Sequence, residues 1–256
     1  LPLALLYRHH VRVMPDYRRR GLNQAFSALV TKFALAEARV DDGYVYTDPH
    51  NELVREWQAS RSGAQTWQTA RAWNHRPFRA LLRCEAVAGA PAGRPATQGE
   101  APRIVALLNA CHQREEMFLP YDEGRLENRL GRLADQYGWA QLWLEGDAVV
   151  GVWEADERCI RDENGSVTES VRAYVLDYGF EPQRGLPDFE RLLRAWCARL
   201  ADLGVTHLSI FSSPASPGSA LIRDLAETSA EVQFQSRLPE PPDVSERGFY
   251  VDHVYF

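Results

Sequence analysis

The chain has 256 residues, of which 45% are hydrophobic and 25% charged, and its formal net charge is -6. This composition is typical of a globular protein, and the length suffices for one large domain or two of ordinary size. The mild acidity argues against a general nucleic-acid-binding protein, and no apolar run approaches the roughly 20 residues that span a bilayer. The four cysteines form no CxxC pair, so we expect no metal site and a cytoplasmic protein with reduced thiols.

Strands and helices are expected to alternate over the first 74 residues. Residues 3–13 predict a strand, 22–38 an amphipathic helix and 43–47 a strand rich in β-formers. Residues 48–63 begin as a turn and continue as a helix, and 64–74 read as a further strand or an irregular return. On the first helix we expect one buried stripe, made of Leu22, Phe26, Leu29, Val30 and Phe33.

A segment rich in Ala, Gly and Pro follows at residues 86–102. It carries almost no large apolar side chain, which is typical of a linker that packs no core. We therefore predict two domains, 1–85 and 103–256, with this linker between them.

The second half predicts a fuller set of elements. Helices are expected at 103–114 and 123–138, a hairpin at 139–155 and a strand at 171–180. A helix at 187–203, a strand at 205–213, a helix at 217–228 and a closing pair of strands at 231–238 and 248–256 complete the chain.

Both halves contain a strand, a loop with Arg-Gly-Leu, an amphipathic helix, a strand and a short helix. The loop holds Gly21 in the first half and Gly185 in the second. This internal repeat predicts two α/β units of one kind.

The first of these loops, in residues 11–26, places three consecutive arginines at a helix start. A helix start presents unpaired N–H groups, and a glycine there lets an anion approach the backbone closely. Arginine adds forked donors that suit phosphate oxygens. The alternative is a run of charges on a solvated surface.

The pattern "VRVMPDYRRRGLN" closely resembles the acyl-CoA-binding motif of the GNAT N-acyltransferase superfamily, with Arg18, Gly21 and Asn23 at its defining positions. Asn23 departs from the usual Gly or Ala, although Asn tolerates left-handed backbone. The resemblance implies that acetyl-CoA or another acyl-CoA is bound by Val11, Arg12, Val13, Arg18, Arg19, Arg20, Gly21, Leu22, Asn23 and Asn51. Asn51 could instead cap the helix that follows it.

The catalytic groups are less defined. Tyr7 and His9 lie on the same predicted strand face as Val11 and are the candidates for the general base, with strand packing as their alternative role. Many family members protonate the leaving thiolate with a Tyr, where this chain has Trp57 and Gln58, so that role has no candidate. Direct attack by the amine, with water relaying the proton, would need neither Tyr7 nor His9.

The resemblance implies an α/β fold of two GNAT-like domains, each a mixed, mostly antiparallel sheet flanked by helices. The first domain would be incomplete at its N-terminus, since about ten residues precede its motif. In the second, Pro182 replaces the first motif residue and Pro187 lacks an N–H, so we expect no cofactor there.

The implied activity is transfer of an acetyl or short acyl group to a primary amine of a small molecule or peptide, without a metal. A non-catalytic scaffold or acyl-CoA sensor is the alternative. Neither nucleic acid nor membrane is an expected partner, and a homodimer is compatible with either activity.

Overall fold

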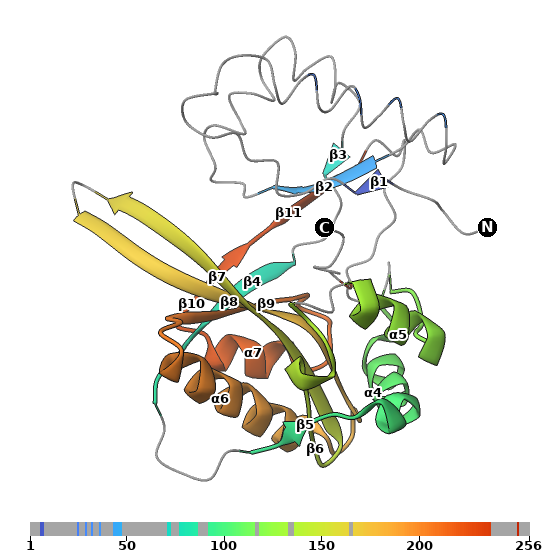
Figure 1. Cartoon of the computed structure of the whole chain (residues 1–256). Coiled ribbons are helices and arrows are strands. Elements are labelled where there is room, and N and C mark those ends of the chain that lie inside the picture. Colours follow the sequence, from blue (N-terminus) through green and yellow to red (C-terminus); the bar gives the residue numbers. More distant parts are fainter. Residues whose placement is uncertain are drawn as a thin grey trace. The chain divides into compact units, whose positions relative to one another are not determined.

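The computed structural model describes residues 6–7, 25, 29, 32, 36, 43–47, 71–72, 77–86, 92–115, 118–132, 136–163, 166–236 and 250 (Figure 1). Of residues 6–7, 43–47, 71–72, 155–163, 166–169 and 233–236 it describes the backbone alone. Its contacts divide the chain into two compact units. The first unit comprises Leu1–Arg76, Glu231–Ser245 and Tyr255–Phe256, and the second comprises Pro77–Ala230 and Glu246–Val254.

The described part of the first unit contains a four-stranded sheet in the order β1-β2-β11-β3. Its strands are β1 (Leu6–Tyr7), β2 (Gly43–Thr47), β3 (Arg71–Ala72) and β11 (Gln233–Ser236). β1 is parallel to β2, whereas β11 is antiparallel to both β2 and β3. The strand predicted at residues 43–47 is confirmed.

Four positions in the predicted helix at 22–38 are described, and all are helical and exposed. Ala25, Leu29, Lys32 and Ala36 are spaced by four, three and four residues, so they share one helix face. Leu29 is 65% exposed, and its predicted place in a buried stripe is wrong. The reason is that Leu29 shares this outer face with Lys32. The other members of the predicted stripe lie outside the described residues.

The second unit contains a larger mixed sheet, whose described strands number seven in the order β10-β4-β9-β8-β7-β6-β5. They are β4 (Phe78–Arg83), β5 (Arg94–Pro95), β6 (Leu142–Glu145), β7 (Ala148–Glu163), β8 (Ser166–Phe180), β9 (His207–Ser212) and β10 (Thr228–Glu231). β8 and β9 are parallel, and β4 pairs with β9 antiparallel, as do β6 with β7 and β7 with β8. The hairpin predicted around Gly146 is the β6–β7 turn.

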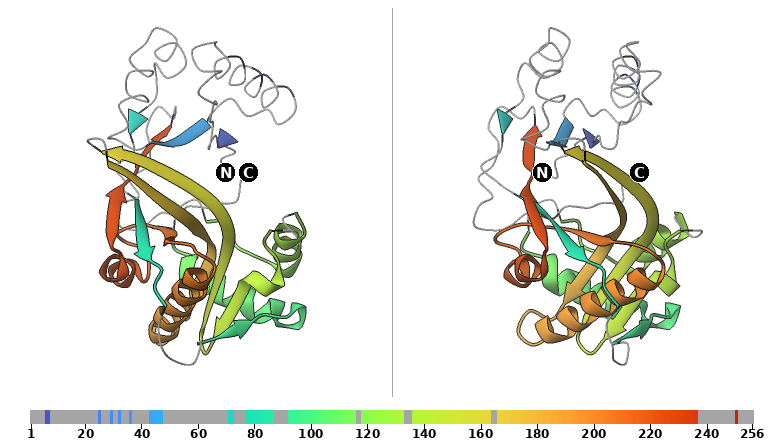
Figure 2. Two further views of the ribbon diagram at one scale, coloured as in Figure 1. Left: turned by 60° about the vertical axis from the view of Figure 1, so that its left-hand side comes forward. Right: turned by 90° about the vertical axis from the view of Figure 1, so that its left-hand side faces the viewer.

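Helices cover both faces of this sheet (Figure 2). They are α4 (Ala101–His112), α5 (Glu123–Arg132), α6 (Leu186–Asp202) and α7 (Ser219–Leu225), with short 3-10 turns η3 (Gln98–Glu100) and η4 (Trp139–Gln141). Along β7, Val150 joins the core under α6 and α7, whereas its neighbour Val149 joins the core under α4 and α5. This alternation is the period of a strand buried on both faces. In the described residues, no helix is long and apolar enough to cross a membrane.

The segment predicted as a linker differs from that expectation where it is described. Arg94 and Pro95 form β5 and pair with β6, and Ala96 is buried in the core beside α4. The physical reason is that small side chains allow close packing: a Cβ on Gly93, whose φ is +79°, would lie 2.5 Å from a methyl carbon of Leu192. A segment poor in large apolar residues can therefore still be an edge strand and a tight turn.

The boundary predicted at residue 85 also differs from the division by contacts. Residues 78–83 form β4, which lies inside the sheet of the second unit, between β9 and β10. Conversely β11, near the other end of the chain, lies inside the sheet of the first unit. In both sheets a parallel pair is followed by one strand from the opposite half of the sequence and then by a third local strand. The described strands β1-β2-β11-β3 and β8-β9-β4-β10 therefore follow the same order.

Candidate functional site

The predicted acyl-CoA loop belongs to the first unit and lies outside the described residues. This holds for His9, Val11, Arg12, Val13, Arg18, Arg19, Arg20, Gly21, Leu22, Asn23 and Asn51. Tyr7 is described as a backbone position in β1, opposite Tyr44 of the parallel strand β2. All these site assignments therefore stay predictions, and the geometry that can be followed is that of the corresponding loop in the second unit.

That second loop, residues 181–185, connects the carboxyl end of β8 to the start of α6. Ligands of α/β proteins commonly bind at the carboxyl ends of parallel strands. The described pairing of β8 with β9 covers residues 172–174, although β8 continues to Phe180. The two strands part beyond Tyr174, and the loop follows the end of the diverging strand.

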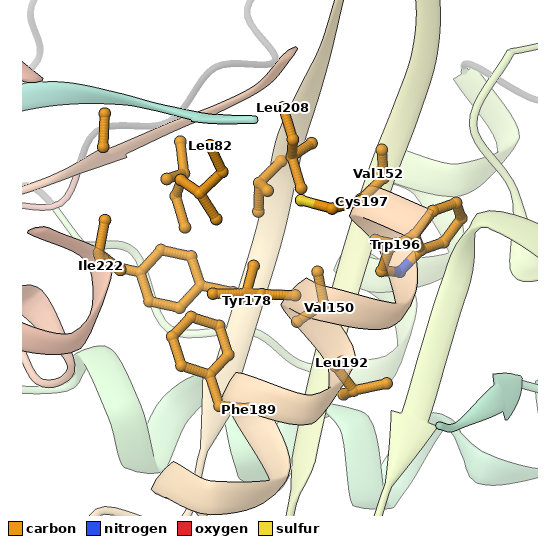
Figure 3. Packing of buried hydrophobic residues seen from close by; sticks show 14 of the residues in the cluster. Leu82, Val150, Val152, Tyr178, Phe189, Leu192, Trp196, Cys197, Leu208 and Ile222 are labelled. Carbon is orange, nitrogen blue, oxygen red and sulfur yellow. The ribbon is translucent and has the colours of Figure 1, made fainter. Parts of the chain in front are cut away.

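Aromatic side chains fill the space beside these diverging strands (Figure 3). Tyr178 reaches from β8 to the end of β9, where its hydroxyl lies 3.5 Å from the Ser212 Oγ. The Phe189 ring, from α6, stacks on Tyr178 with centroids 5.3 Å apart and on Phe180 at 4.9 Å. All three rings are buried, so packed core occupies this position in the second unit.

The N–H groups of the second loop are bonded within the chain. The Glu181 N–H donates to the Asp147 carbonyl at 3.0 Å, and the other three are bonded inside the loop. The Glu181 carboxylate accepts hydrogen bonds from the Gln183 N–H at 2.9 Å and the Arg184 N–H at 3.0 Å, and the Gly185 N–H donates to the Glu181 carbonyl at 2.8 Å. Pro182 and Pro187 have no N–H to offer. The donors that a bound phosphate would need are therefore either absent or already engaged by carboxylate and carbonyl oxygens of the chain.

The loop also packs against the β6–β7 turn. A Cβ on Gly185 would lie 2.5 Å from the Asp147 carbonyl oxygen, so this glycine serves a close approach of two backbone segments. The Asp188 carboxylate accepts the Asp147 N–H at 2.7 Å, and the Arg184 Nε lies 2.7 Å from the Asp147 carboxylate. The loop arginine is thus paired with a carboxylate.

A buried charged cluster lies at the end of α4, around His112 and Glu115. The His112 Nδ1 contacts a Glu115 carboxylate oxygen, and its Nε2 lies 2.7 Å from the Tyr178 carbonyl oxygen. Both ring nitrogens face oxygen atoms, an arrangement that favours the doubly protonated, cationic imidazole. Ser216, in the β9–α7 loop, donates its hydroxyl to the other Glu115 oxygen.

The electrostatics agree with that assignment. Burial by itself lowers the pKa of His112, but Cys111 and Glu115 raise it, and the net pKa is well above its usual value. The rings of Phe118, Tyr178 and Tyr250 pack around the imidazole with centroids 4.7 to 5.5 Å away. We predicted no role for His112 from the sequence, although Glu115 follows it by three residues, a spacing that can bring two side chains together at a helix end.

A second buried polar cluster is centred on Asp177 of β8. Its carboxylate accepts hydrogen bonds from the Tyr121 hydroxyl at 2.8 Å, the Tyr137 hydroxyl at 2.7 Å and the Arg129 Nε at 2.9 Å. Burial, followed by the Asp177 charge, holds the pKa of Tyr137 well above its usual value. Both carboxylate oxygens are hydrogen-bonded, so Asp177 joins α5, the segment before it and the segment before η4 to the sheet. Within the described ranges, no group of three or more His, Cys, Asp or Glu residues could hold a metal ion.

Comparisons with known proteins identify solved structures that share the fold of this chain. No family model and no curated protein matches the chain. Two solved structures of N-myristoyltransferase from Saccharomyces cerevisiae with bound myristoyl-CoA align with TM-scores of 0.57 and 0.54, both at 8% identity, covering 95% and 99% of this chain and 65% and 66% of theirs. A GCN5-related N-acetyltransferase from Sphaerobacter thermophilus aligns at a TM-score of 0.49 and 14% identity, covering 91% of this chain and 73% of that one.

The likeness to the myristoyltransferases shows a shared fold. It confirms the predicted α/β class with a mixed sheet flanked by helices. The chain spans about two thirds of the length of those myristoyltransferase chains.

Proposed function

We propose that the chain is a GNAT-type N-acyltransferase that moves an acetyl or other short acyl group from acyl-CoA to a primary amine of a small molecule or peptide. The observation that carries the proposal is the sequence of residues 11–23, in which a strand leads into Arg18-x-x-Gly21-x-Asn23. The parallel pair of β1, which precedes this loop, and β2, which follows it, supports the proposal, since ligands of α/β proteins commonly bind at the carboxyl ends of parallel strands. The fold shared with structures that hold myristoyl-CoA supports it as well.

In this proposal the loop amides and Arg18 bind the pyrophosphate of the donor, and the backbone around Arg12 aligns the pantetheine arm. The amine attacks the thioester carbonyl, strand N–H groups stabilise the tetrahedral intermediate, and the CoA thiol leaves. Tyr7, His9 or a relaying water accepts the ammonium proton.

We further propose that the second unit binds no acyl-CoA, so that each chain binds one donor. Three observations support this: the Glu181 carboxylate engages the loop amides, Pro182 and Pro187 lack N–H groups, and aromatic rings fill the space beside the diverging strands. The second unit would then have a role other than binding the donor.

Titration calorimetry with acetyl-CoA tests both statements. We expect one site per chain, and we expect Gly21→Trp to abolish binding because the indole blocks the close approach of the pyrophosphate. Gly99→Trp is the matched control, since a Cβ on the exposed Gly99 meets no atom within 4 Å. Absence of binding to the full-length protein, or retained affinity in Gly21→Trp, would overturn the proposal. Two equivalent sites per chain would contradict the statement that the second unit binds no acyl-CoA.

A non-catalytic acyl-CoA sensor is the second candidate, and it is favoured by the missing hydroxyl at Trp57 and Gln58. Thiol release from acetyl-CoA, followed by a chromogenic thiol reagent across a panel of primary amines, separates the two. Binding without release for every amine would favour the sensor, whereas amine-dependent release identifies the enzyme.

A further inference from the structure

We propose that Cys84 and Cys197 form a dithiol site that low-molecular-weight disulfides convert into an intramolecular disulfide joining β4 to α6. This inference concerns the second unit and is independent of acyl-CoA binding.

The strand period places Cys84 on the face of the sheet that α6 covers. Along β4, Phe78, Ala80 and Leu82 are buried in the core beneath α6, whereas Arg83 points outward and is exposed. Cys84 is the next residue on the inward side. Its N–H donates to the Thr206 carbonyl at 2.9 Å, which continues the pairing of β4 with β9 past Arg83.

Cys197 approaches the same point from the helix. It is 8% exposed and belongs to the core cluster against which Cys84 packs. Figure 3 shows its sulfur directed from α6 toward Leu208, which is paired with Leu82 on β4. The connection from α6 to β9 is short and closed by a hydrogen bond from the Val205 N–H to the Leu200 carbonyl at 3.0 Å, which holds helix and strand together here.

Both thiols therefore belong to the same region of the core, where β4 and β9 meet α6. The Cys84 S–H is hydrogen-bonded to Cys197, and this bond, followed by burial, raises the pKa of Cys84 well above its usual value. The thiolate of Cys84 is therefore rare at neutral pH, so reaction with a disulfide is slow and accelerates as the pH rises.

The chemistry is ordinary thiol–disulfide exchange. Cys84, which is partly exposed, loses its proton and attacks one sulfur of the small disulfide; an S–S bond to the protein forms and one small thiolate leaves. The more buried Cys197 then loses its proton to solvent, and its sulfur attacks the Cys84 sulfur of this mixed disulfide and displaces the second small thiolate. The two protein thiols are oxidised, and the small disulfide is reduced to two thiols.

The cross-link would join β4, which precedes the predicted linker in the sequence, to α6. Closing so long a loop restricts the unfolded chain strongly, so we expect the oxidised protein to melt about 5 to 10 °C higher than the reduced protein.

The test uses the full chain in a Cys159→Ser background, which removes the thiol whose side chain lies outside the described residues. After incubation with oxidised glutathione, we expect the intact mass measured before alkylation to fall by two hydrogens. After alkylation and digestion, we expect one peptide pair, containing Cys84 and Cys197, to be cross-linked. Cys84→Ser should abolish the cross-link with the fold retained, and Cys197→Ala should stop the reaction at glutathionylated Cys84.

Oxidation that leaves both thiols open to alkylation after unfolding would overturn the proposal, as would a cross-link to Cys111 or a cross-link that survives in Cys84→Ser. The rate should rise between pH 7 and pH 9. A pH-independent rate would contradict the role given to the Cys84 proton.

Discussion

His112 and Glu115 place opposite charges in the interior of the second unit, where each depends on the other. The imidazole is fully buried, and both of its nitrogens face oxygen acceptors. Removing one member of such a pair leaves the other charge or dipole without compensation, and this commonly costs about 3 to 5 kcal/mol.

We therefore predict that Glu115→Gln lowers the free energy of unfolding by about 3 kcal/mol at pH 6. Glu190→Gln is the matched control: Glu190 pairs with Arg194 on the exposed side of α6, and its loss should change stability by less than about 0.5 kcal/mol. Urea unfolding followed by tryptophan fluorescence measures both. Equal effects of the two substitutions would contradict the buried ion pair.

The same pair predicts a pH dependence. The pKa of His112 is raised in the folded protein, so the folded state holds the proton more tightly, and the stabilisation is complete below the unfolded pKa of about 6.5. It is lost as the pH rises from there through the folded pKa. In Glu115→Gln the carboxylate no longer raises the pKa of His112, while burial still lowers it, so the loss of stability between pH 6.5 and pH 8 should be smaller than in the natural chain. Unfolding free energies at pH 5.5, 6.5 and 8 would show this difference once the Glu190→Gln profile is subtracted.

Helix α4 packs against β8 through Gly179. A Cβ at this position would lie 2.7 Å from the Leu107 carbonyl oxygen and from the Leu108 Cα, both of them backbone atoms of α4. Gly179→Ala must therefore displace the helix, and we predict a loss of about 1 to 3 kcal/mol.

Gly131→Ala is the matched control for this prediction. Gly131 lies in α5, and a Cβ there meets nothing within 4 Å, so alanine should stabilise the helix by up to about 1 kcal/mol. Thermal unfolding of both variants decides the matter. If Gly179→Ala is as stable as the natural chain, the two elements are not in backbone contact.

Elements with a strong period were predictable from the sequence. The helix expected at 187–203 is α6, because Phe189, Leu193 and Trp196 repeat at helical spacing and Gly204 ends it. The β6–β7 hairpin followed from alternation around Gly146 in the same way. The role of residues 94–96 was not predictable, because a two-residue edge strand has no period and its pairing with β6 depends on residues about 50 positions away.

The buried clusters were missed for a related reason. His112, Ser216 and Tyr178 are far apart in the sequence, and only the packing of α4 and the β9–α7 loop against β8 brings them together. Pro182 and Pro187 indicated from the sequence that the second loop is degenerate. The hydrogen bonds from its N–H groups to the Glu181 carboxylate became visible only in the structure.

On the scale of the whole molecule, each sheet contains one strand from the half of the sequence that mainly forms the other sheet. β4 precedes the predicted linker, yet it lies between β9 and β10 in the second unit, and Phe78, Ala80 and Leu82 belong to that unit's core. A sheet that loses such a strand exposes two edges and an apolar face, both of which promote aggregation. The sequence boundary at residue 85 would cut this sheet apart.

This yields a prediction that distinguishes the two boundaries. A fragment of residues 77–230 keeps β4 and should be soluble and unfold cooperatively, whereas residues 86–230 should aggregate or melt without a transition, because β9 and β10 lose their shared partner. The two fragments lack the same C-terminal residues, so they differ by β4 and its flanking residues alone.

Circular dichroism and size-exclusion chromatography would measure the difference in folding between the two fragments. A synthetic peptide of residues 77–86, present during refolding, should restore folding of the shorter fragment. If residues 86–230 fold and melt at the same temperature as 77–230, β4 is dispensable and the strand exchange does not stabilise the molecule.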